Sequence, residues 1–519
     1  MQAGELRLSA SMPIHIGHIH IDGMKTRGKN ILVIAVVGLL IAAGVHFTQE
    51  FRFYNIESND LFLYDFADIW SRLLQTGGLA TVLASALTQF MRIPFAGTVI
   101  VTAVYLSVWW LTRSVMRKRT ESAVMDGLAF LPSAFLFLCM ENDYYRFQGH
   151  IAFLFAMMAL KAYVSVPREK VRTRAALGVL MVPVLYQTAG SVAVMYAASV
   201  MLWEITDRGW KGLWAVVYPA VMLVTAYVYV DNSMVSDWEH AMTPFMYYDW
   251  PSTYFFPVYA WTMVPVLVLA AWAVSLIRMK PSYVKAVAVA GLAVSFFLAG
   301  NFYSQVHSRT FYRMIQEQYW AENQEWDRII KTADRRQPTF LVSYLNLALA
   351  HKGQLVQNFR YYNPQDLSSL MYPTPNLKTG LSLQSTVYMA WGYLGSARKA
   401  AFDGNVVTPG SSHPRQLQAL IKINLVMGAH DVAEKYISIL ERTLFYKGWA
   451  SSMRVFLGNE EAVKADKEMG MMYASLPLTD EYARLDGIVG DMRDIHEACP
   501  DNVILSQFYE LYKILEGAQ

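Results

Sequence analysis

The side chains best suited to chemistry gather in a short polar segment between two long apolar runs. Glu141 and Asp143 stand one residue apart there, and Arg146 and His150 follow. Alternate side chains of an extended segment point the same way, so both carboxylates can bind one hard cation, such as Mg²⁺ or Mn²⁺. The planar guanidinium of Arg146 suits a phosphate oxygen, and His150 is a second candidate for substrate binding. The alternative is a solvated loop whose arginine pairs with its own acids.

A second group of acids lies upstream, where Asp60, Asp65 and Asp68 fall within one short segment. A carboxylate held near a membrane surface can act as general base toward a hydroxyl group. Asp60 and Asp65 are therefore the catalytic candidates. The structural alternatives are an N-cap role for Asp60 and, for the other two acids, a solvated helix face shared with Arg72.

A third polar segment, residues 237–240, contains Trp238, which we predict to line a binding groove; a plain polar loop is the alternative. The sequence contains no phosphate-cradling glycine loop, no zinc-protease motif and no serine-hydrolase elbow. Cys139 and Cys499 lie far apart, which excludes a cysteine metal site and argues against a disulfide. Nothing therefore supports an ATPase, a zinc protease or a serine hydrolase.

The composition is typical of a membrane protein. Of the 519 residues, 54% are hydrophobic and 16% are charged, whereas soluble domains have roughly 25% charged residues. Aromatic residues make up 14%, as expected where many rings lie at the level of lipid headgroups. The net charge of +3 argues against a nucleic-acid partner. Membrane lipids are the expected surroundings.

Apolar helices must position these side chains, because about 20 apolar residues are needed to cross a bilayer. We predict an all-α fold with a polytopic transmembrane helical bundle of about nine spans within residues 24–303. Residues 1–23 are interpreted as an extension without a structural role, with translation starting at Met24. The expected spans are residues 30–48, 94–113, 122–140, 150–166, 174–187, 189–206, 211–230, 256–277 and 283–303.

Lysine and arginine are distributed unevenly between the loops. Basic clusters precede the first expected span and follow the second, fourth, sixth and eighth, whereas residues 231–255 contain four acids and no lysine or arginine. Loops rich in basic residues face the cytoplasm. We therefore expect a bacterial inner-membrane protein with a cytoplasmic N-terminus. Loops 49–93, 141–149 and 231–255, and everything after residue 303, are then periplasmic or extracytoplasmic.

The first outer loop is expected to contain two amphipathic helices within residues 59–93, separated at Gly77-Gly78. One apolar stripe consists of Phe62, Phe66, Ile69 and Leu73, and the next of Leu79, Leu83, Leu87 and Phe90. Such helices lie in the membrane interface plane. A short connector packed on the neighbouring spans is the alternative.

Residues 304–519 have a soluble composition and a helical-repeat pattern. Three apolar helical stretches reach glycines at Gly353, Gly395 and Gly428, similar to tetratricopeptide-type helical hairpins with an irregular period. Stacked helix pairs form concave surfaces, so peptide or protein binding is expected. A structural lid over the membrane part is the alternative.

This arrangement resembles the GT-C superfamily of polytopic glycosyltransferases, over roughly residues 30–230. Asp60, with Tyr64 and Ala67 downstream, resembles the acidic first-loop pattern of bacterial members, and residues 141–143 fall at the second-loop position. The resemblance implies a polyprenyl-phosphate sugar donor, an acid after the first span as catalytic base, and Tyr64 as a substrate-binding residue. Two departures are Leu61, where many members have a second acid, and the loose second-loop motif.

Three hypotheses follow. The first is transfer of a sugar from a polyprenyl-phosphate donor to an envelope glycan or protein, with Asp60 as base and Glu141 and Asp143 holding a metal ion or the acceptor. The second is a membrane-anchored scaffold without enzymatic activity, whose helical-repeat domain binds envelope proteins. The third is a transporter, which the few polar residues within the spans argue against. The whole chain also resembles bacterial membrane proteins with a helical-repeat tail.

Overall fold

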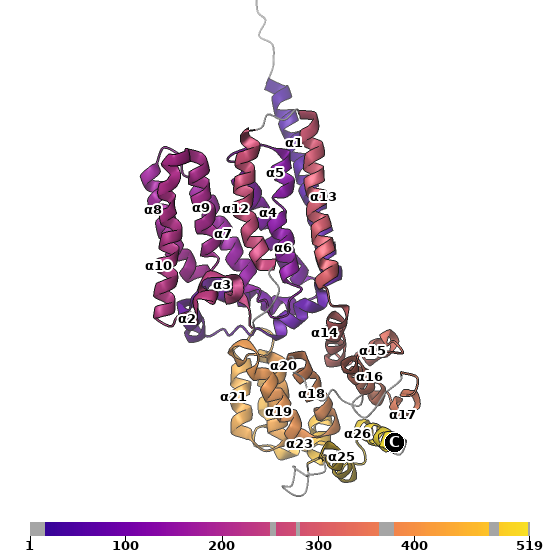
Figure 1. Ribbon diagram of the computed structural model, residues 1–519. Helices are drawn as coiled ribbons and strands as arrows, with labels where there is room; N and C mark the ends of the chain where they lie inside the picture. The colour runs from indigo at the N-terminus through magenta and orange to yellow at the C-terminus, as the bar shows by residue number, and fades with distance from the viewer. Residues whose placement is uncertain (1–15, 250–255, 277–280, 363–377, 477–486, 517–519) are drawn as a thin grey trace, which may run out of the picture.

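The computed structural model describes residues 16–249, 256–276, 281–362, 378–476 and 487–516. Within these ranges every regular element is a helix, and one isolated antiparallel bridge joins Tyr145 to Tyr248. The predicted all-α class is therefore confirmed. Long helices form a bundle, and shorter helices form a C-terminal domain at one end of it (Figure 1).

The bundle has one large apolar core. Its first helix begins at Ile16, upstream of Met24, and continues without interruption to Ser58. The helices of the bundle are α1 (Ile16–Ser58), α4 (Ala96–Met116), α5 (Ala123–Leu128), α6 (Leu131–Cys139), α7 (Gln148–Ser165), α8 (Val171–Ala189), α9 (Ala193–Arg208), η2 (Gly209–Val216), α10 (Val217–Asp231), α12 (Phe256–Leu276) and α13 (Pro281–Val306).

Four helical stretches in the described residues are long and apolar enough to cross a membrane. They are Ala96–Met116, Ala193–Asp231, Phe256–Leu276 and Val289–Val306. The second stretch comprises α9, η2 and α10, and α9 packs against α10. Every other expected span also overlaps a helix, and residues 122–140 are divided between α5 and α6. The chain therefore has the features of a membrane protein, while the count of about nine spans stays a prediction.

Glycine and proline mark the turns and irregular points of the bundle's helices. Gly190 follows α8 with a φ of 95°, a conformation that favours glycine because it has no Cβ. The chain turns there and begins α9 three residues later, at Ala193. Pro183 and Pro265 lie inside α8 and α12, as is tolerated where neighbouring helices restore the backbone hydrogen bonds.

The first outer loop folds into α2 (Phe66–Leu74), α3 (Gly78–Thr88) and η1 (Gln89–Arg92). Two helices were expected here, and both are present. α2 begins later than its apolar stripe suggested, so Phe62 lies outside the helix and is buried. Asp65 accepts the N-cap hydrogen bond from Ala67 N. The alternative in which Asp60 caps this helix is therefore wrong.

The C-terminal domain consists of stacked helical hairpins. α18 packs on α19, α19 on α20 and α20 on α21. Gly353, Gly392 and Gly428 follow α16, α18 and α20 with positive φ, so Gly392, rather than the expected Gly395, is the turn glycine of the second hairpin. The helices are α14 (Arg309–Glu322), α15 (Trp326–Thr332), α16 (Thr339–His351), α17 (Leu355–Asn358), α18 (Lys378–Trp391), α19 (Leu394–Val406), η5 (Pro409–Ser411), α20 (Pro414–Val426), α21 (His430–Leu440), α22 (Lys447–Met453), η6 (Arg454–Phe456), α23 (Glu460–Ala465), α24 (Lys467–Ala474), α25 (Gly487–Ala498) and α26 (Val503–Glu516).

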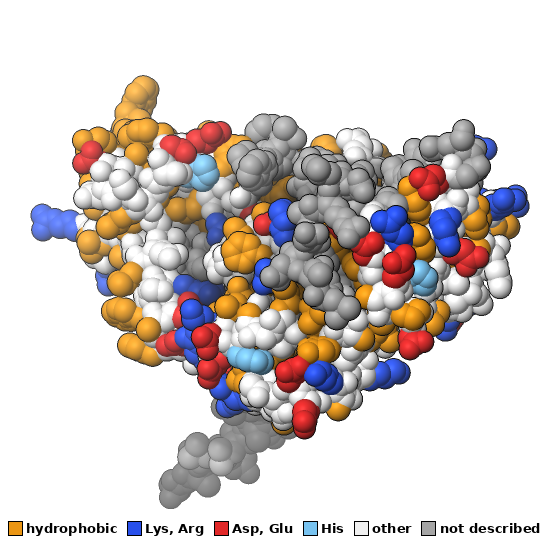
Figure 2. Space-filling view, turned by 90° about the horizontal axis from the view of Figure 1, so that it is seen from below, with side chains coloured by type: hydrophobic (Ala, Val, Ile, Leu, Met, Phe, Trp, Pro, Cys, Tyr) orange, Lys and Arg blue, Asp and Glu red, His pale blue; other side chains and the backbone are white. Residues whose placement is uncertain are grey.

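The segment after the bundle's first helix is bound to the C-terminal domain. Leu61 belongs to one apolar cluster of that domain, and Phe51 of α1 packs against the other. Tyr64 N donates to Arg442 O over 2.7 Å, and the Arg442 guanidinium lies 2.6 Å from Asp65. Viewed from the side of the C-terminal domain, acidic and basic side chains are interspersed on the surface (Figure 2).

Candidate functional site

A cavity of about 360 Å³ lies between the bundle and the C-terminal domain. Its walls are the end of α1, one face each of α2 and α3, the segment before and at the start of α7, and Pro409 and Gly410 of the C-terminal domain. Asp60, Asp143 and Arg146 all line it. The fold thus brings three of the predicted site residues to one cavity although they come from two distant loops.

Asp60 lies against α3. Its carboxylate accepts hydrogen bonds from Ser85 Oγ at 2.9 Å and Thr88 Oγ1 at 3.3 Å, and Arg72 Nη1 lies 4.0 Å away. Ser85 and Thr88 are three residues apart and so share one face of the helix. Burial raises the pKa of Asp60 above its usual value, while the two hydroxyl groups and Arg72 oppose that rise. The side chain is 31% exposed, so a ligand can reach it.

Arg72 is held by α2 itself and by the loop before it. Its Nε lies 2.9 Å from Asp68 Oδ2, and its Nη2 donates to Leu61 O over 3.2 Å. The pairing of Asp68 and Arg72 four residues apart corresponds to the structural alternative given for Asp68. Both side chains line the cavity, so this polar face of α2 forms part of its wall.

Asp143 and Arg146 are placed by backbone pairing between two outer loops. Arg146 N donates to Tyr247 O, and Asp249 N donates to Tyr144 O, each over 2.9 Å. The Arg146 side chain donates to Met246 O over 2.7 Å and lies 3.4 Å from Asp249. Asp143 accepts a hydrogen bond from Asn55 of α1.

The charged side chains of the cavity are mostly acidic. Four aspartates and two arginines line it: Asp60, Asp68, Asp143, Asp249, Arg72 and Arg146. The excess of carboxylates attracts cations, and the arginines supply donors suited to an anionic group. A ligand that combines a divalent cation with a phosphate therefore matches both kinds of side chain.

Glu141 does not line this cavity. Its carboxylate is 2% exposed and lies 3.0 Å from Arg52 of α1 and 2.8 Å from His307, which follows α13. Asp143 and Glu141 therefore have different partners in the structure, although the sequence predicts that both hold one cation.

Residues 26–517 match a family described as a family of unknown function, DUF6057. The chain belongs to the DUF6057 family. No curated protein and no solved structure matches it.

The remaining predicted site residues of this DUF6057 chain lie elsewhere. Asp65 caps α2 and pairs with Arg442, and Tyr64 exchanges hydrogen bonds with Gln89. His150 is fully buried, with its Nε2 3.0 Å from Leu136 O. Trp238 is 47% exposed and packs against Tyr227. None of these four side chains lines the cavity.

Several cavity residues were not predicted as site residues. Asn55, Asp249 and Gln148 are polar but fall in no recognisable motif, and Pro409 and Gly410 come from the other end of the chain. Thr81, Ser85 and Gln89 recur in the sequence at a spacing of four residues, so they share the polar side of the second outer helix. The role of Ser85 as a partner of Asp60 depends on the loop path, which periodicity does not specify.

Proposed function

We propose that this protein transfers a sugar from a polyprenyl-phosphate donor to a glycan or protein acceptor at the outer face of a membrane. The observation that carries the proposal is the meeting of Asp60, Asp143 and Arg146 at one cavity. In this proposal the bundle crosses the membrane about nine times, with a cytoplasmic N-terminus, as the distribution of basic residues favours.

Asp60 is the proposed general base. Its carboxylate takes the proton of the acceptor hydroxyl, the acceptor oxygen bonds to the sugar's anomeric carbon, and the bond from that carbon to the donor phosphate breaks. The lipid phosphate leaves with the bonding electrons, and the configuration at the anomeric carbon is inverted. The raised pKa of Asp60 supports this role, because a stronger base accepts a proton more readily at neutral pH.

Arg146 and Asp143 are proposed to act on the donor phosphate. Arg146 supplies N–H donors, and Asp143 would hold a Mg²⁺ or Mn²⁺ ion, which would supply positive charge beside the phosphate. The described residues contain no group of three or more His, Cys, Asp or Glu side chains able to hold a metal. Mg²⁺ is often bound by one or two carboxylates together with substrate phosphates, and that arrangement is the one proposed.

The two faces of α2 support access from the membrane. Phe66, Trp70 and Leu74 are between 53% and 78% exposed, whereas Asp68 and Arg72 face the cavity. A helix with this division of side chains lies in the membrane interface. A lipid-linked donor can then remain in the bilayer while its head group enters beside α2, and the acceptor approaches from the side of Pro409 and Gly410.

The experiment compares three variants of the full chain: Asp60→Asn, Asp143→Asn and the control Asp403→Asn. Asp403 is 39% exposed, pairs with Lys399 and belongs to α19, away from the cavity. Cells without their own copy receive each variant, and envelope glycan output and protein level are measured. We expect Asp60→Asn to lower transfer by about 10²- to 10⁴-fold and Asp403→Asn to leave it unchanged. Undiminished output from a well-expressed Asp60→Asn chain would falsify the proposal.

The second candidate function is a membrane-anchored scaffold that binds envelope proteins through the C-terminal domain. The observation that favours it is a second hollow of about 890 Å³, lined largely by that domain. A scaffold does not need the cavity acids. Full rescue by both Asp60→Asn and Asp143→Asn therefore favours the scaffold over the transferase.

A further inference from the structure

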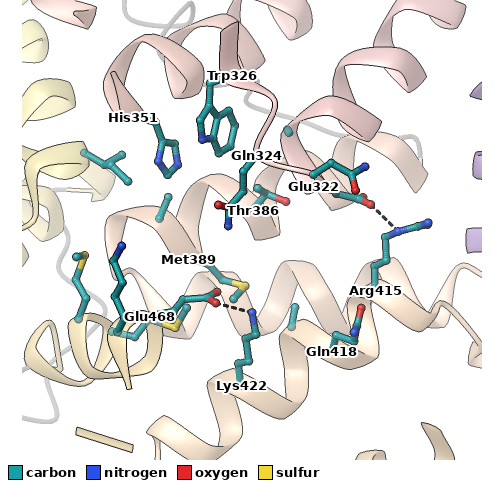
Figure 3. Close-up of a pocket in the computed structure, with 18 of the residues that line it drawn as sticks. Glu322, Gln324, Trp326, His351, Thr386, Met389, Arg415, Gln418, Lys422 and Glu468 are labelled. Atoms are coloured by element: carbon teal, nitrogen blue, oxygen red, sulfur yellow. Dashed lines mark hydrogen bonds and ion pairs between the residues drawn. The ribbon is translucent and has the colours of Figure 1, made fainter. Parts of the chain in front are cut away.

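The larger hollow, or groove, opens among the helices of the C-terminal domain (Figure 3). The ends of α14 and α16 form one side, α18 and α20 form the floor, and α24 forms another side. Its volume of about 890 Å³ falls in the range of sites that enclose a ligand, roughly 300–1,000 Å³.

The face of α20 in the groove is polar. Arg415, Gln418, Ala419 and Lys422 line the groove, and their spacing places them on one side of a helix. The other side of α20 packs into the domain through Leu417, Leu420 and Ile421, which are buried. α20 therefore packs through one face and presents hydrogen-bonding side chains along about 10 Å of the other.

The three acids of the groove are all engaged by protein groups. Glu322 lies 2.5 Å from Arg415, and Glu468 lies 2.6 Å from Lys422. Figure 3 shows these two ion pairs at separate places along α20, with Met389 beside the pair of Glu468 and Lys422. Asp466 accepts hydrogen bonds from the backbone N–H groups of Glu468 and Met469 at the start of α24. Glu322 and Glu468 are thus paired with cations, and Asp466 is bonded by the backbone.

Two cations of the groove, unlike Glu322 and Glu468, have no partner of opposite charge among the described residues. Among the described residues, neither Arg92 nor Lys467 has a carboxylate partner, and Arg92 instead lies over the Tyr446 ring, 4.6 Å from its centre. Burial lowers the pKa of His351, which also lines the groove, to about 4, so its ring is uncharged at neutral pH. Four cations and three acids of the described residues line the groove, which leaves a net charge of +1 there, and Arg92 and Lys467 are the two cations without a carboxylate partner.

Apolar side chains with adaptable shapes complete the lining. Met389 and Met471 are flexible thioethers of the kind that line surfaces accepting varied peptide sequences. Trp326 stacks on His351 with ring centres 4.1 Å apart, and Trp449 lines the groove as well. An extended chain with alternating apolar and acidic side chains matches the rings and thioethers, and also the two cations that have no carboxylate partner among the described residues.

We propose that the groove binds an extended acidic peptide segment of a partner protein. The segment lies along α20, with its backbone bonded to the amide and charged side chains of that helix and its carboxylates near Arg92 and Lys467. Binding of this kind does not depend on sugar transfer in the smaller cavity. The inference gives a ligand class to the scaffold function and is compatible with the transferase.

The test uses the purified full chain in detergent and three fluorescein-labelled peptides of equal length. One alternates Glu with Ala and Tyr, the second has Gln in place of Glu, and the third has Lys. Fluorescence anisotropy gives each Kd. We expect the Glu peptide to bind about tenfold more tightly than the Gln peptide, because two partly exposed ion pairs contribute about that factor. The Lys peptide should bind most weakly, and added salt should reduce the preference.

Lys467→Glu is the decisive variant, since Lys467 is exposed and its replacement leaves the buried contacts intact. It should abolish the preference for the Glu peptide, and Arg92→Glu should do the same. Lys435→Glu makes the same charge change on an exposed site of α21 that does not line the groove, and should keep the preference.

Three outcomes would overturn the inference. They are equal affinity for the Glu and Gln peptides, an unaltered preference in Lys467→Glu, and tighter binding of an oligogalacturonate probe than of the Glu peptide. The last outcome would assign the groove to an acidic glycan. All three are measured by binding alone, so they are distinguishable from failure of the transferase, which is measured by glycan output.

Discussion

At the scale of single residues, the surroundings of Asp60 act on its pKa in opposite directions. Its position against α3 removes solvent and raises its pKa, whereas Ser85, Thr88 and Arg72 favour the ionised form. A carboxylate in this environment holds a proton more strongly than an ordinary aspartate. The Ser85 hydroxyl is the largest of the opposing contributions, so it is the group to remove.

Ser85→Ala should shift the acid limb of the pH–rate profile to higher pH. The hydroxyl donates to the carboxylate and stabilises its charged form, so its loss raises the pKa of Asp60 further. A smaller fraction of the enzyme then has an ionised base at a given acidic pH. On that limb the rate should fall about two- to tenfold, the effect of one hydrogen bond, with little change on the plateau.

The control for this profile is Ser452→Ala, at an exposed serine of α22 whose hydroxyl bonds to Trp449 O. Its profile should match that of the unaltered protein. A Ser85→Ala limb that moves to lower pH, or does not move, would show that the limb reports a group other than Asp60.

Residue type alone located Asp60, Asp143 and Arg146 as candidates, but it also selected residues that do not line the cavity. Asp65 has the same carboxylate group as the four aspartates that line the cavity, and His150 is as polar as several cavity residues. They differ in what the fold puts beside them, namely the first turn of α2 for Asp65 and the carbonyl of Leu136 for His150. Glu141 has partners 89 and 166 positions away in the sequence, and no local pattern specifies such pairings.

At the scale of elements, the turn between α2 and α3 decides how the cavity wall is placed. A Cβ on Gly78 would come 2.4 Å from Arg72 O and 2.5 Å from Leu73 O. These are backbone atoms at the end of α2, so the clash can be relieved only by moving one helix relative to the other. Asp68 and Arg72 would move with α2.

Gly78→Ala should therefore lower both stability and transfer activity. Forcing one extra carbon into such a contact costs about 1–3 kcal/mol, which thermal denaturation will detect. Gly448→Ala is the matched control, because no atom beyond its chain neighbours and its own helix backbone lies within 4 Å of the Cβ it would gain. That change lies in α22 and should stabilise the chain by about 0.5–1 kcal/mol. Equal effects of the two substitutions would contradict the role assigned to the turn.

The elements themselves were largely predictable, because each reflects local periodicity. Every expected span overlaps a helix, and each of the two expected outer helices is present. The misplacements occur where capping decides a boundary. α2 begins at Phe66 because Asp65 caps it, and the second hairpin turns at Gly392 because that residue takes the positive φ. The contacts of α1 with the C-terminal domain were not predicted, since they join segments far apart in the chain.

At the scale of the whole molecule, the last turns of α1 separate the two hollows. Tyr54 lines the groove, whereas Asn55, Ile56 and Asn59 line the smaller cavity. Glu57, between them, is 3% exposed and lies 3.0 Å from Arg415 of α20. Arg415 also pairs with Glu322 and lies over the Tyr54 ring. One arginine thus connects the C-terminal domain to the helix that borders both hollows.

Arg415→Ala should disconnect the C-terminal domain from the bundle. Removal of the guanidinium leaves Glu57 buried without its cation, and breaking a buried pair in this way costs on the order of 3–5 kcal/mol. A single thermal transition of the full chain should become two, with the C-terminal domain unfolding first, and proteolysis should become faster near residues 59–65. Scanning calorimetry and timed digestion measure the two effects.

Arg454→Ala provides the comparison, because Arg454 also pairs with two acids, Glu434 and Glu441, but is 39% exposed. Solvent screens exposed pairs, so this variant should keep one transition close to that of the unaltered chain. If both variants unfold alike, the ion pairs of Arg415 contribute no more to stability than exposed surface pairs do. If only Arg415→Ala divides the transition, the end of α1 holds the two parts of the chain together. A ligand in the groove can then affect the cavity that contains Asp60 through this segment.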